Sequence, residues 1–340
     1  MTDARTSDSP MRTIDVHAHV DVPAIMPLVQ GQSGLAAEQA AQFATFGPES
    51  TKLNIELATT SYRPLLDDIS VRLQHMDAGL VDMQAVSVVP TLYHYWADAS
   101  LGAEIAAAAN EQIAATVAQA PDRLVGLANV SLQHGELAAE QLRTATESLG
   151  LRGVEISTSV AGRELSDRAL DPFWAAAESL GSFVFIHPWG CSLGSRLATS
   201  YLGNIVGNPT ETTVALNHIV FGGVLDRFPG LKICGAHGGG YFPHYLARAD
   251  HAYSVRPESR TMQREPSAYL DSLYFDSLVY STGELSRLVQ AVGADHVVIG
   301  TDYPFDMGVP DPIARLDAID LPAADRDAVA GATAARLLGL

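Results

Sequence analysis

The sequence predicts an α/β protein folded as a single (β/α)8 TIM barrel, and three observations support this prediction. Short apolar runs alternate with amphipathic helical stretches eight times along the chain. The apolar runs are continuous, as expected of parallel strands that are covered on both faces. No linker rich in proline, glycine or serine divides the chain, and no internal repeat is visible. A doubly wound open sheet would give a similar pattern and remains an alternative at this point.

The predicted elements alternate regularly after a first strand within 13–19. Residues 23–62 are mixed in composition, so we expect an inserted loop with some helix directly after a strand end, where sites are often built. A helix is predicted over 65–78, because apolar residues recur on one face and Gly79 follows. The other strands are predicted at 83–90, 124–130, 153–157, 183–187, 231–236, from 273 onward and at 297–300, and the other helices at 101–118, 135–149, 171–180, 208–228, 242–253 and 283–292.

Composition and charge narrow the class of protein. The 340 residues are 47% hydrophobic and 18% charged, as in a packed globular protein and unlike a disordered chain. We expect residues 1–12 to be a disordered N-terminal tail and residues 13–340 to form one barrel domain. The net charge of −18 argues against nucleic-acid partners, which require a basic surface.

Cysteine usage and hydropathy bear on location. The two cysteines, Cys191 and Cys234, give no disulfide framework, which suits a reducing cytoplasm. The N-terminus shows no basic segment followed by an apolar one, as a signal peptide would. No apolar run approaches the ~20 residues that a membrane span requires. We therefore expect a cytoplasmic protein that has no membrane partner.

Polar residues that can bind a metal follow several of the predicted strands. His17 and His19 end the first strand, and side chains at i and i+2 of a strand point to the same face. His187, His237 and Asp302 each follow another apolar strand. In a barrel these strand ends meet at the C-terminal mouth, where barrel enzymes place their catalytic groups. Imidazoles with a carboxylate suit Zn²⁺, with Mn²⁺, Fe²⁺ and Co²⁺ as alternatives.

Each of these residues also has a purely structural explanation. His187 precedes Pro188 and could be a core histidine bonded to a backbone carbonyl. Asp302 precedes Tyr303 and Pro304 and could cap a turn. Five such residues at matching strand ends are hard to explain separately, so together they favour a metal site. We therefore expect residues 13–340 to be a metal-dependent barrel.

The motifs together carry a resemblance to a known family. The segments that carry it are Ile14-Asp15-Val16-His17-Ala18-His19, Tyr62-Arg63-Pro64, Met76-Asp77, Val89-Pro90, His187-Pro188-Trp189, Pro209-Thr210-Glu211-Thr212-Thr213, Ala236-His237-Gly238-Gly239-Gly240 and Gly300-Thr301-Asp302-Tyr303-Pro304-Phe305. They occur in order from residue 14 to 305 and so span most of the chain. With these segments the chain resembles the amidohydrolase superfamily, and within it the aminocarboxymuconate-semialdehyde decarboxylase-like group.

The resemblance implies roles for individual residues. One zinc ion per subunit would be bound by His17, His19, His187 and Asp302. Asp302 would also be catalytic. His237 would be the acid/base residue that activates a metal-bound water. Arg63 would bind a substrate carboxylate, and Arg248 would reach the site from a neighbouring subunit, which implies a homodimer.

The substrate-binding candidates have alternatives. Arginine pairs bidentately with carboxylates, so Arg63 and Arg248 would suit a dicarboxylate and explain how an acidic protein binds an anion. Without the family, both are better interpreted as solvated surface charges, and Arg256 is a weaker second candidate. Trp189 could stack on a flat conjugated substrate or simply pack; the sequence favours neither.

The number of metal ions follows from the fourth strand. Two-metal members of the superfamily use a carboxylated lysine there, whereas residues 153–156 contain none, and Lys232 on the sixth strand should face outward. One metal is therefore expected. Glu155 could bridge two metals or satisfy the barrel interior, and both explanations stay open. Cys191 could be reactive or a small buried apolar residue.

We therefore predict a metal-dependent, oxygen-independent decarboxylase, a C–C lyase. Its substrate would be a small unsaturated or aromatic carboxylate such as 2-amino-3-carboxymuconate 6-semialdehyde or a hydroxybenzoate. A hydrolase of an amide or lactone bond and a hydratase of a ring-cleavage product are alternatives; a non-catalytic barrel is disfavoured. Residues 23–62, Gly190-Cys191 and Asp306-Met307 depart from the aminocarboxymuconate pattern, which leaves the substrate open.

Overall fold

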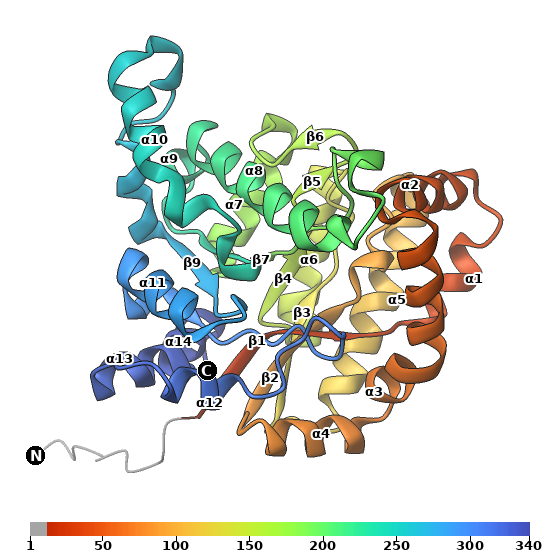
Figure 1. Ribbon diagram of the computed structural model, residues 1–340. Coiled ribbons are helices and arrows are strands. Elements are labelled where there is room, and N and C mark those ends of the chain that lie inside the picture. The colour runs from red at the N-terminus through yellow and green to blue at the C-terminus, as the bar shows by residue number, and fades with distance from the viewer. Residues whose placement is uncertain (1–11) are drawn as a thin grey trace, which may run out of the picture.

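Eight parallel strands form a barrel at the centre of the molecule (Figure 1). The computed structural model describes residues 12–340, so the predicted tail lies outside the described residues except for Arg12. Neighbouring strands pair in chain order, and two bridges, Asp15 to Ile299 and Ala18 to Tyr303, close the first strand onto the end of the last. The barrel strands are β1 (Ile14–Val20), β2 (Met83–Val88), β3 (Leu124–Ala128), β4 (Gly153–Ile156), β7 (Phe183–Ile186), β8 (Lys232–Gly235), β9 (Leu273–Asp276) and β10 (Val297–Val298).

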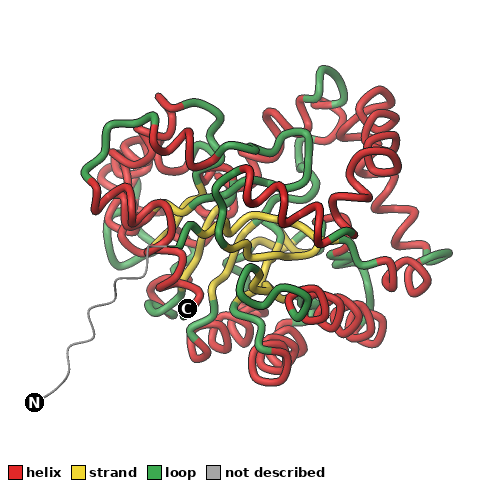
Figure 2. The backbone as a smooth tube through the Cα atoms, turned by 90° about the horizontal axis from the view of Figure 1, so that it is seen from below, coloured by secondary structure: helices red, strands yellow, loops and turns green. Residues whose placement is uncertain are grey.

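Helices surround the strands on the outside (Figure 2). The predicted barrel is confirmed, because the strands pair in chain order and the two bridges close the sheet, which excludes the open doubly wound sheet. The helices after the first strand's insertion are α4 (Ile69–Ala78), α5 (Ala99–Val117), α6 (Gly135–Leu149), α7 (Asp171–Leu180), α8 (Asn208–Phe221), α9 (Val224–Arg227), α10 (Phe242–Val255), α11 (Thr282–Val292), α12 (Pro312–Asp317), α13 (Ala323–Asp327) and α14 (Thr333–Leu338). Each helix of residues 12–340 is too short or too polar to cross a bilayer.

Two predicted helices are each split into two. The helix expected over 65–78 begins earlier, as α3 (Arg63–Asp67), and restarts after Asp68, whose side chain caps the backbone N–H groups of Ser70 and Val71. The helix expected over 208–228 breaks at Gly222 and Gly223 into α8 and α9. Gly223 takes a left-handed conformation with φ +65°, which interrupts the helix. Glycine adopts this conformation without the steric strain that a side chain would cause.

The insertion after β1 is mostly helical. The expectation of a loop with some helix was therefore wrong, because helix makes up most of this segment. It contains α1 (Met26–Val29), α2 (Ser33–Leu57) and a π-helical turn, Ala58–Tyr62. Alanine, glutamine and glutamate are good helix formers and outweigh the interruption at Gly47. There the backbone turns to φ 72° and ψ 175°, and Pro48 starts the second half of the helix.

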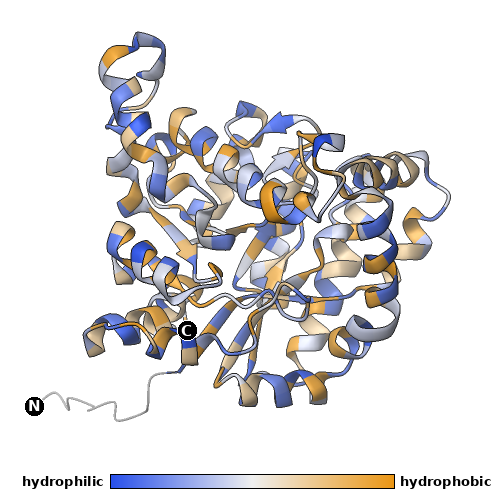
Figure 3. Cartoon of the chain, viewed as in Figure 1, coloured by the Kyte–Doolittle hydropathy of each residue, from blue (hydrophilic) through white to orange (hydrophobic). Residues whose placement is uncertain are grey.

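Several elements were not predicted at all. A small antiparallel hairpin, β5 (Ser159–Val160) with β6 (Arg163–Glu164), follows β4. The C-terminal helices α12 to α14 complete the outer layer, and α14 closes the bottom of the barrel. Leu337 of that helix packs with Val16, Phe185 and Val298 inside the barrel. A second, larger apolar cluster lies between strands and helices, and the helices accordingly carry both hydrophobic and hydrophilic residues (Figure 3).

Strand β1 is fixed by polar contacts on its outer side. Its pairing with β2 shifts in register between Asp15 and Ala18, so the polar and apolar faces exchange there. Arg72 of α4 is 1% exposed and donates hydrogen bonds to the Gln84 side chain (3.0 Å) and to the carbonyl of His19 (2.6 Å). The buried guanidinium of Arg72 therefore holds β1, the strand that carries the two histidines, on its outer side.

Candidate metal centre

The four predicted metal ligands come together at the C-terminal mouth of the barrel. His17 and His19 lie on β1, His187 follows β7, and Asp302 follows β10. One nitrogen from each imidazole and one carboxylate oxygen lie within 4.8 Å of one another, and all four residues are buried. Residues separated by up to 285 positions in the chain thus form one compact site.

The donor atoms fit a divalent metal ion. Nε2 of His17, Nε2 of His19 and both ring nitrogens of His187 are buried without a hydrogen-bond partner in the described structure. Leaving buried polar atoms unpaired costs about 1–3 kcal/mol each, so a cluster of them calls for a ligand. A metal ion that accepts lone pairs would satisfy Nε2 of His17, Nε2 of His19 and one of the two ring nitrogens of His187.

The protonation states point the same way. Burial and the neighbouring imidazoles of His17 and His19 hold the pKa of His187 well below its usual value, so the ring is neutral and one of its nitrogens has a free lone pair. Burial alone would raise the pKa of Asp302, but the neighbouring histidines, His17 above all, outweigh it and hold the pKa well below its usual range. Neutral imidazole and ionised carboxylate are the forms that bind metal.

An outer shell orients the two histidines of β1. His17 Nδ1 lies 2.7 Å from Oδ2 of Asp276, and His19 Nδ1 lies 3.1 Å from the carbonyl oxygen of Val88. With Nδ1 engaged, the Nε2 atom of each ring is left for the shared space, as in most metal-binding histidines. Burial lowers the pKa of His17, yet Asp302 and Asp276 outweigh it and raise the pKa to about 10. The centre therefore attracts positive charge strongly.

Asp276 was missed in the sequence, although the signal was present. It directly follows the apolar residues of β9, as the predicted ligands follow their strands. Its Oδ1 accepts a hydrogen bond from the backbone N–H of Gly238 (2.8 Å), so it links His17 to the segment after β8. The same search for polar residues at strand ends would have found it.

Glu155 supports the barrel interior. Its side chain is fully buried; one oxygen accepts from the Tyr93 hydroxyl (2.6 Å) and the other from the Ser87 hydroxyl (2.6 Å). The nearer oxygen lies 3.8 Å from Nδ1 of His19, on the side of the ring opposite to its free nitrogen. Both carboxylate oxygens are thus engaged, and the alternative that Glu155 bridges two metals finds no support here.

His237 lies beside the four ligands without joining them. Its ring centroid is 5.3 Å from that of His17 and 5.2 Å from that of His187, and its Nε2 is 4.0 Å from Oδ2 of Asp302. Its Nδ1 is buried and unpartnered among the described residues. Three glycines with positive φ follow it, a backbone conformation that glycine adopts readily. An imidazole held next to a metal site is well placed to move protons.

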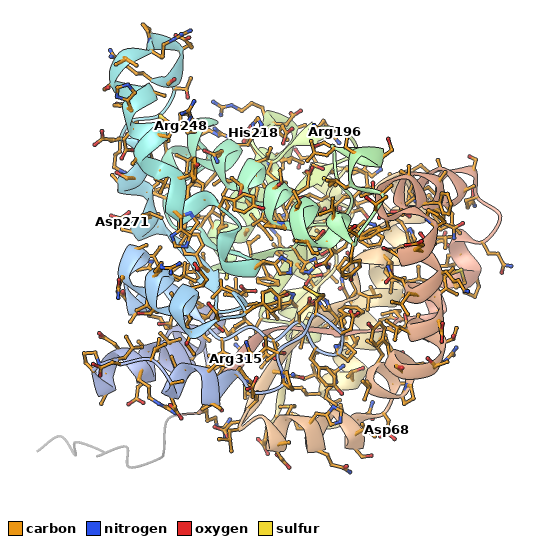
Figure 4. The ribbon with its side chains drawn as sticks, viewed as in Figure 1. Asp68, Arg196, His218, Arg248, Asp271 and Arg315 are labelled. Carbon is orange, nitrogen blue, oxygen red and sulfur yellow. The ribbon has the colours of Figure 1, made fainter. Side chains whose placement is uncertain are left out.

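The arginine candidates are exposed within one chain. The Arg63 side chain is 67% exposed and pairs with Asp67 at 3.4 Å. Arg248 is exposed on α10, at one side of the molecule (Figure 4). Arg256 is also exposed and pairs with Glu258. None of the three contributes to the metal cluster of its own chain.

Trp189 and Cys191 follow His187 at the mouth. Trp189 is partly buried against the core, and its indole nitrogen has no partner in the described structure. Burial raises the pKa of the half-buried Cys191 thiol to about 11. A thiol that stays protonated is a poor nucleophile, and Cys191 also packs closely against Gly207, so both observations favour the packing explanation.

Replacing Asp276 with Asn tests the outer shell. Asp276→Asn keeps the shape of the side chain but removes the negative charge beside His17, and we expect metal affinity to fall about 10- to 100-fold. Competition with a chromophoric chelator measures this. Asp271→Asn, an equal change of charge on the exposed surface, should leave affinity unchanged. Equal affinities for both variants would show that Asp276 does not act on the metal.

Comparison with known proteins places the chain among relatives of defined activity. It is 36% identical over 276 residues to the 2-amino-3-carboxymuconate-6-semialdehyde decarboxylase of Dictyostelium discoideum, covering 80% of this chain and 77% of that protein. It is 28% identical to the gamma-resorcylate decarboxylase of Rhodococcus jostii, covering 81% and 89%. The crystal structure of 5-carboxyvanillate decarboxylase LigW from Sphingomonas paucimobilis superimposes with a TM-score of 0.83 at 26% identity, covering 97% and 99%.

The family itself is shown by a match over almost the entire chain. The family model described as Amidohydrolase matches residues 14–340, which confirms the resemblance that the sequence motifs indicated. The sequence motifs and the barrel fold both agree with this family match. The chain therefore belongs to the amidohydrolase family.

Proposed function

We propose that the protein is a metal-dependent, oxygen-independent decarboxylase of a small aromatic or unsaturated carboxylate. The observation that carries the proposal is the buried set of three imidazoles and one carboxylate with His237 beside it. The relatives with this fold are named for removing a carboxyl group from different conjugated substrates: 2-amino-3-carboxymuconate 6-semialdehyde, gamma-resorcylate and 5-carboxyvanillate. The shared step is loss of CO2, so the proposal is a carboxy-lyase.

The metal would be held by His17, His19, His187 and Asp302, one ion per subunit. Three nitrogens and one oxygen suit Zn²⁺, and two structural neighbours were determined with manganese, so Mn²⁺ is the main alternative. When bound, the ion supplies positive charge that draws the anionic substrate to the mouth and stabilises negative charge there.

Side chains of the protein would deliver the proton to the substrate carbon and favour the release of CO2. Decarboxylation breaks a C–C bond, releases CO2 and leaves the electron pair on carbon, which must then take up a proton. His237, with an unpartnered ring nitrogen, is our candidate for the group that holds and delivers this proton. Asp302 lies next to His237 and can stabilise its protonated form. Burial of these groups keeps water away and favours release of neutral CO2.

The substrate's further charge would be met by arginines from two subunits. Arg63 lies on α3, which directly follows the insertion, and we propose that it binds a carboxylate at the mouth. Tyr241, directly before α10, and Tyr245 and Arg248 within it recur at helical spacing, and the two tyrosines are 45% and 69% exposed. Exposed aromatic residues with arginine are typical of the centre of an interface, which supports a homodimer that places Arg248 near the neighbouring site. The cytoplasmic location expected from the cysteine content belongs to the same proposal.

The experiment is CO2 release by metal-loaded protein without oxygen. The substrates would be 2-amino-3-carboxymuconate 6-semialdehyde, 2,6-dihydroxybenzoate and 5-carboxyvanillate, each with a chelated control. We expect CO2 from at least one of them, abolished by chelation and restored by metal. Absence of CO2 from folded, metal-loaded protein that hydrolyses a lactone or hydrates a ring-cleavage product would replace the proposal with one of those activities.

His237→Asn separates the acid/base residue from the ligands. Because general acid/base catalysis contributes typically 100- to 10,000-fold, we expect kcat to fall by about that range while bound metal stays constant. Metal content and CO2 release are measured on the same sample. His218→Asn, a half-exposed histidine on α8 that faces Glu164, is the control and should retain activity. Joint loss of metal in His237→Asn would make His237 a ligand.

Mixing two inactive variants tests the shared site. In a symmetric dimer of one Arg248→Ala chain and one His237→Asn chain, one of the two sites has both native residues. Random reassociation of equal amounts should therefore restore about a quarter of the native activity. Each variant alone would be nearly inactive. Without recovery in a verified mixed dimer, Arg248 does not act across the interface.

A further inference from the structure

A fully buried carboxylate lies two residues before His17 and is not one of the four predicted metal ligands. Asp15 is on β1, and its two oxygens accept four hydrogen bonds. Its Oδ1 accepts from the backbone N–H of His17 (3.0 Å) and from that of Thr301 (3.1 Å). Its Oδ2 accepts from the Thr301 hydroxyl (2.6 Å) and from the side-chain amide of Gln84 (2.9 Å). A buried carboxylate is tolerated because its oxygens are satisfied in this way.

The hydrogen bonds of Asp15 connect the two chain segments that carry three of the four ligands. His17 and His19 belong to β1, whereas Thr301 directly precedes Asp302 after β10. A single oxygen of Asp15 accepts from the backbone of both segments, so it fixes the distance between them. The Thr301 hydroxyl adds a second contact. The position of Asp302 relative to the histidines therefore depends on Asp15.

Gln84 connects this carboxylate to a buried cation. It pairs with Asp15 across β1 and β2 and is 2% exposed. Its amide nitrogen donates to Asp15, and its amide oxygen accepts from Arg72 of α4 at 3.0 Å. An amide has a donor and an acceptor on separate atoms, so it can bond a carboxylate and a guanidinium at the same time. The direction of each hydrogen bond from Arg72 to Asp15 is thus determined.

Arg72 contacts both segments as well. Its guanidinium donates to the carbonyl of His19 (2.6 Å), and its central carbon lies 4.6 Å from the centre of the Tyr303 ring. Tyr303 directly follows Asp302, and its carbonyl accepts from the backbone N–H of His19 at 2.8 Å. Four side chains thus form one hydrogen-bonded series around the barrel closure. We call this series the closure network, which consists of Arg72, Gln84, Asp15 and Thr301.

A carboxylate with similar bonds lies in the outer layer of the protein. Asp226 of α9 accepts from the Tyr269 hydroxyl (2.5 Å) and from the backbone N–H of Gln263 (2.9 Å). Neither partner is a predicted metal ligand or the sequence neighbour of one. Asp226 therefore has the same kinds of hydrogen-bond donors as Asp15 without the connection to the ligands, which makes it a matched control.

We propose that Asp15 is a positioning residue of the metal centre. By accepting from both sides of the barrel closure, it sets the Asp302 carboxylate against His17, and Gln84 and Arg72 hold Asp15 itself in place. Ligands that are already oriented bind a metal ion more tightly than ligands that must first be ordered. This inference rests on the metal centre of the proposed function and not on the reaction, so metal binding tests it.

The test measures Co²⁺ binding to Asp15→Asn by visible absorption. Asparagine has the shape of aspartate, but one end of its side chain donates and would face the amide nitrogen of Gln84, which also donates. A Gln84 amide that turned to accept would lose its bond to Arg72. We expect Co²⁺ affinity to fall about 10- to 100-fold, and the absorption bands of bound Co²⁺ to change because they depend on coordination geometry.

The double variant Asp15→Asn/Gln84→Glu is the rescue. It moves the carboxylate from β1 to β2, where it accepts from the introduced amide and from Arg72. Donors and acceptors are matched again, and the net charge equals that of the native protein. We expect native absorption bands and a Co²⁺ affinity within about twofold of the native value.

Two further variants separate positioning from stability. Thr301→Val removes only the hydroxyl contact and should lower Co²⁺ affinity about threefold, so it carries the test if Asp15→Asn does not fold. Asp226→Asn makes the same chemical change as Asp15→Asn at a carboxylate whose bonds do not involve the ligands. It should keep the native affinity and bands whatever its melting temperature.

The outcomes separate this inference from the proposed function. Native Co²⁺ affinity and bands in folded Asp15→Asn would overturn it, as would weakened binding that Gln84→Glu does not restore or an equal weakening in Asp226→Asn. If Asp15→Asn does not fold, native affinity in Thr301→Val would overturn it. Co²⁺ binding that depends on Asp15 in a protein that releases no CO2 would leave the positioning role standing and reject the decarboxylase. Release of CO2 by a protein whose Co²⁺ affinity is unaffected by Asp15→Asn would do the reverse.

Discussion

The closure of the barrel between its first and last strands is the interaction on which the metal centre depends. The backbone N–H of Asp302 donates to the carbonyl of His17 (2.8 Å), and that of His19 donates to the carbonyl of Tyr303 (2.8 Å). These two hydrogen bonds close the barrel and set the carboxylate of Asp302 against the two imidazoles of β1. The same strand pairing therefore closes the barrel and positions the metal ligands. A shift in register of one residue would break both the closure and the ligand arrangement.

Apart from the histidines, the buried charged side chains at the C-terminal mouth of the barrel are negative. Asp302, Asp276 and Glu155 are buried there, and the buried cation behind β1, Arg72, is engaged by Gln84 and the carbonyl of His19. Several carboxylates in a dry site are unfavourable unless a cation compensates them. A divalent ion would do so, and it would also give an acidic protein the local positive potential needed to bind a carboxylate.

The sequence predicted what depends on strand periodicity and little of what depends on packing. His17, His19, His187, His237 and Asp302 were found because parallel strands of a barrel deliver their ends to one mouth. Helix α2 was underestimated because Gly47 and Pro48 interrupt a strongly helical composition. The contact between Gln42 and Gly190, and the unpaired indole of Trp189, arise where the insertion meets the segment after β7. Such tertiary contacts leave no local pattern in the chain.

The most direct test of the central claim, that these four residues form one metal centre, is metal content combined with X-ray absorption spectroscopy. We expect one divalent ion per chain, with nitrogen and oxygen ligands at about 2.0–2.2 Å and no sulfur ligand, and loss of that ion in His187→Ala. Retention of the ion in folded His187→Ala, or failure of the native protein to bind any ion from a zinc or manganese buffer, would contradict it.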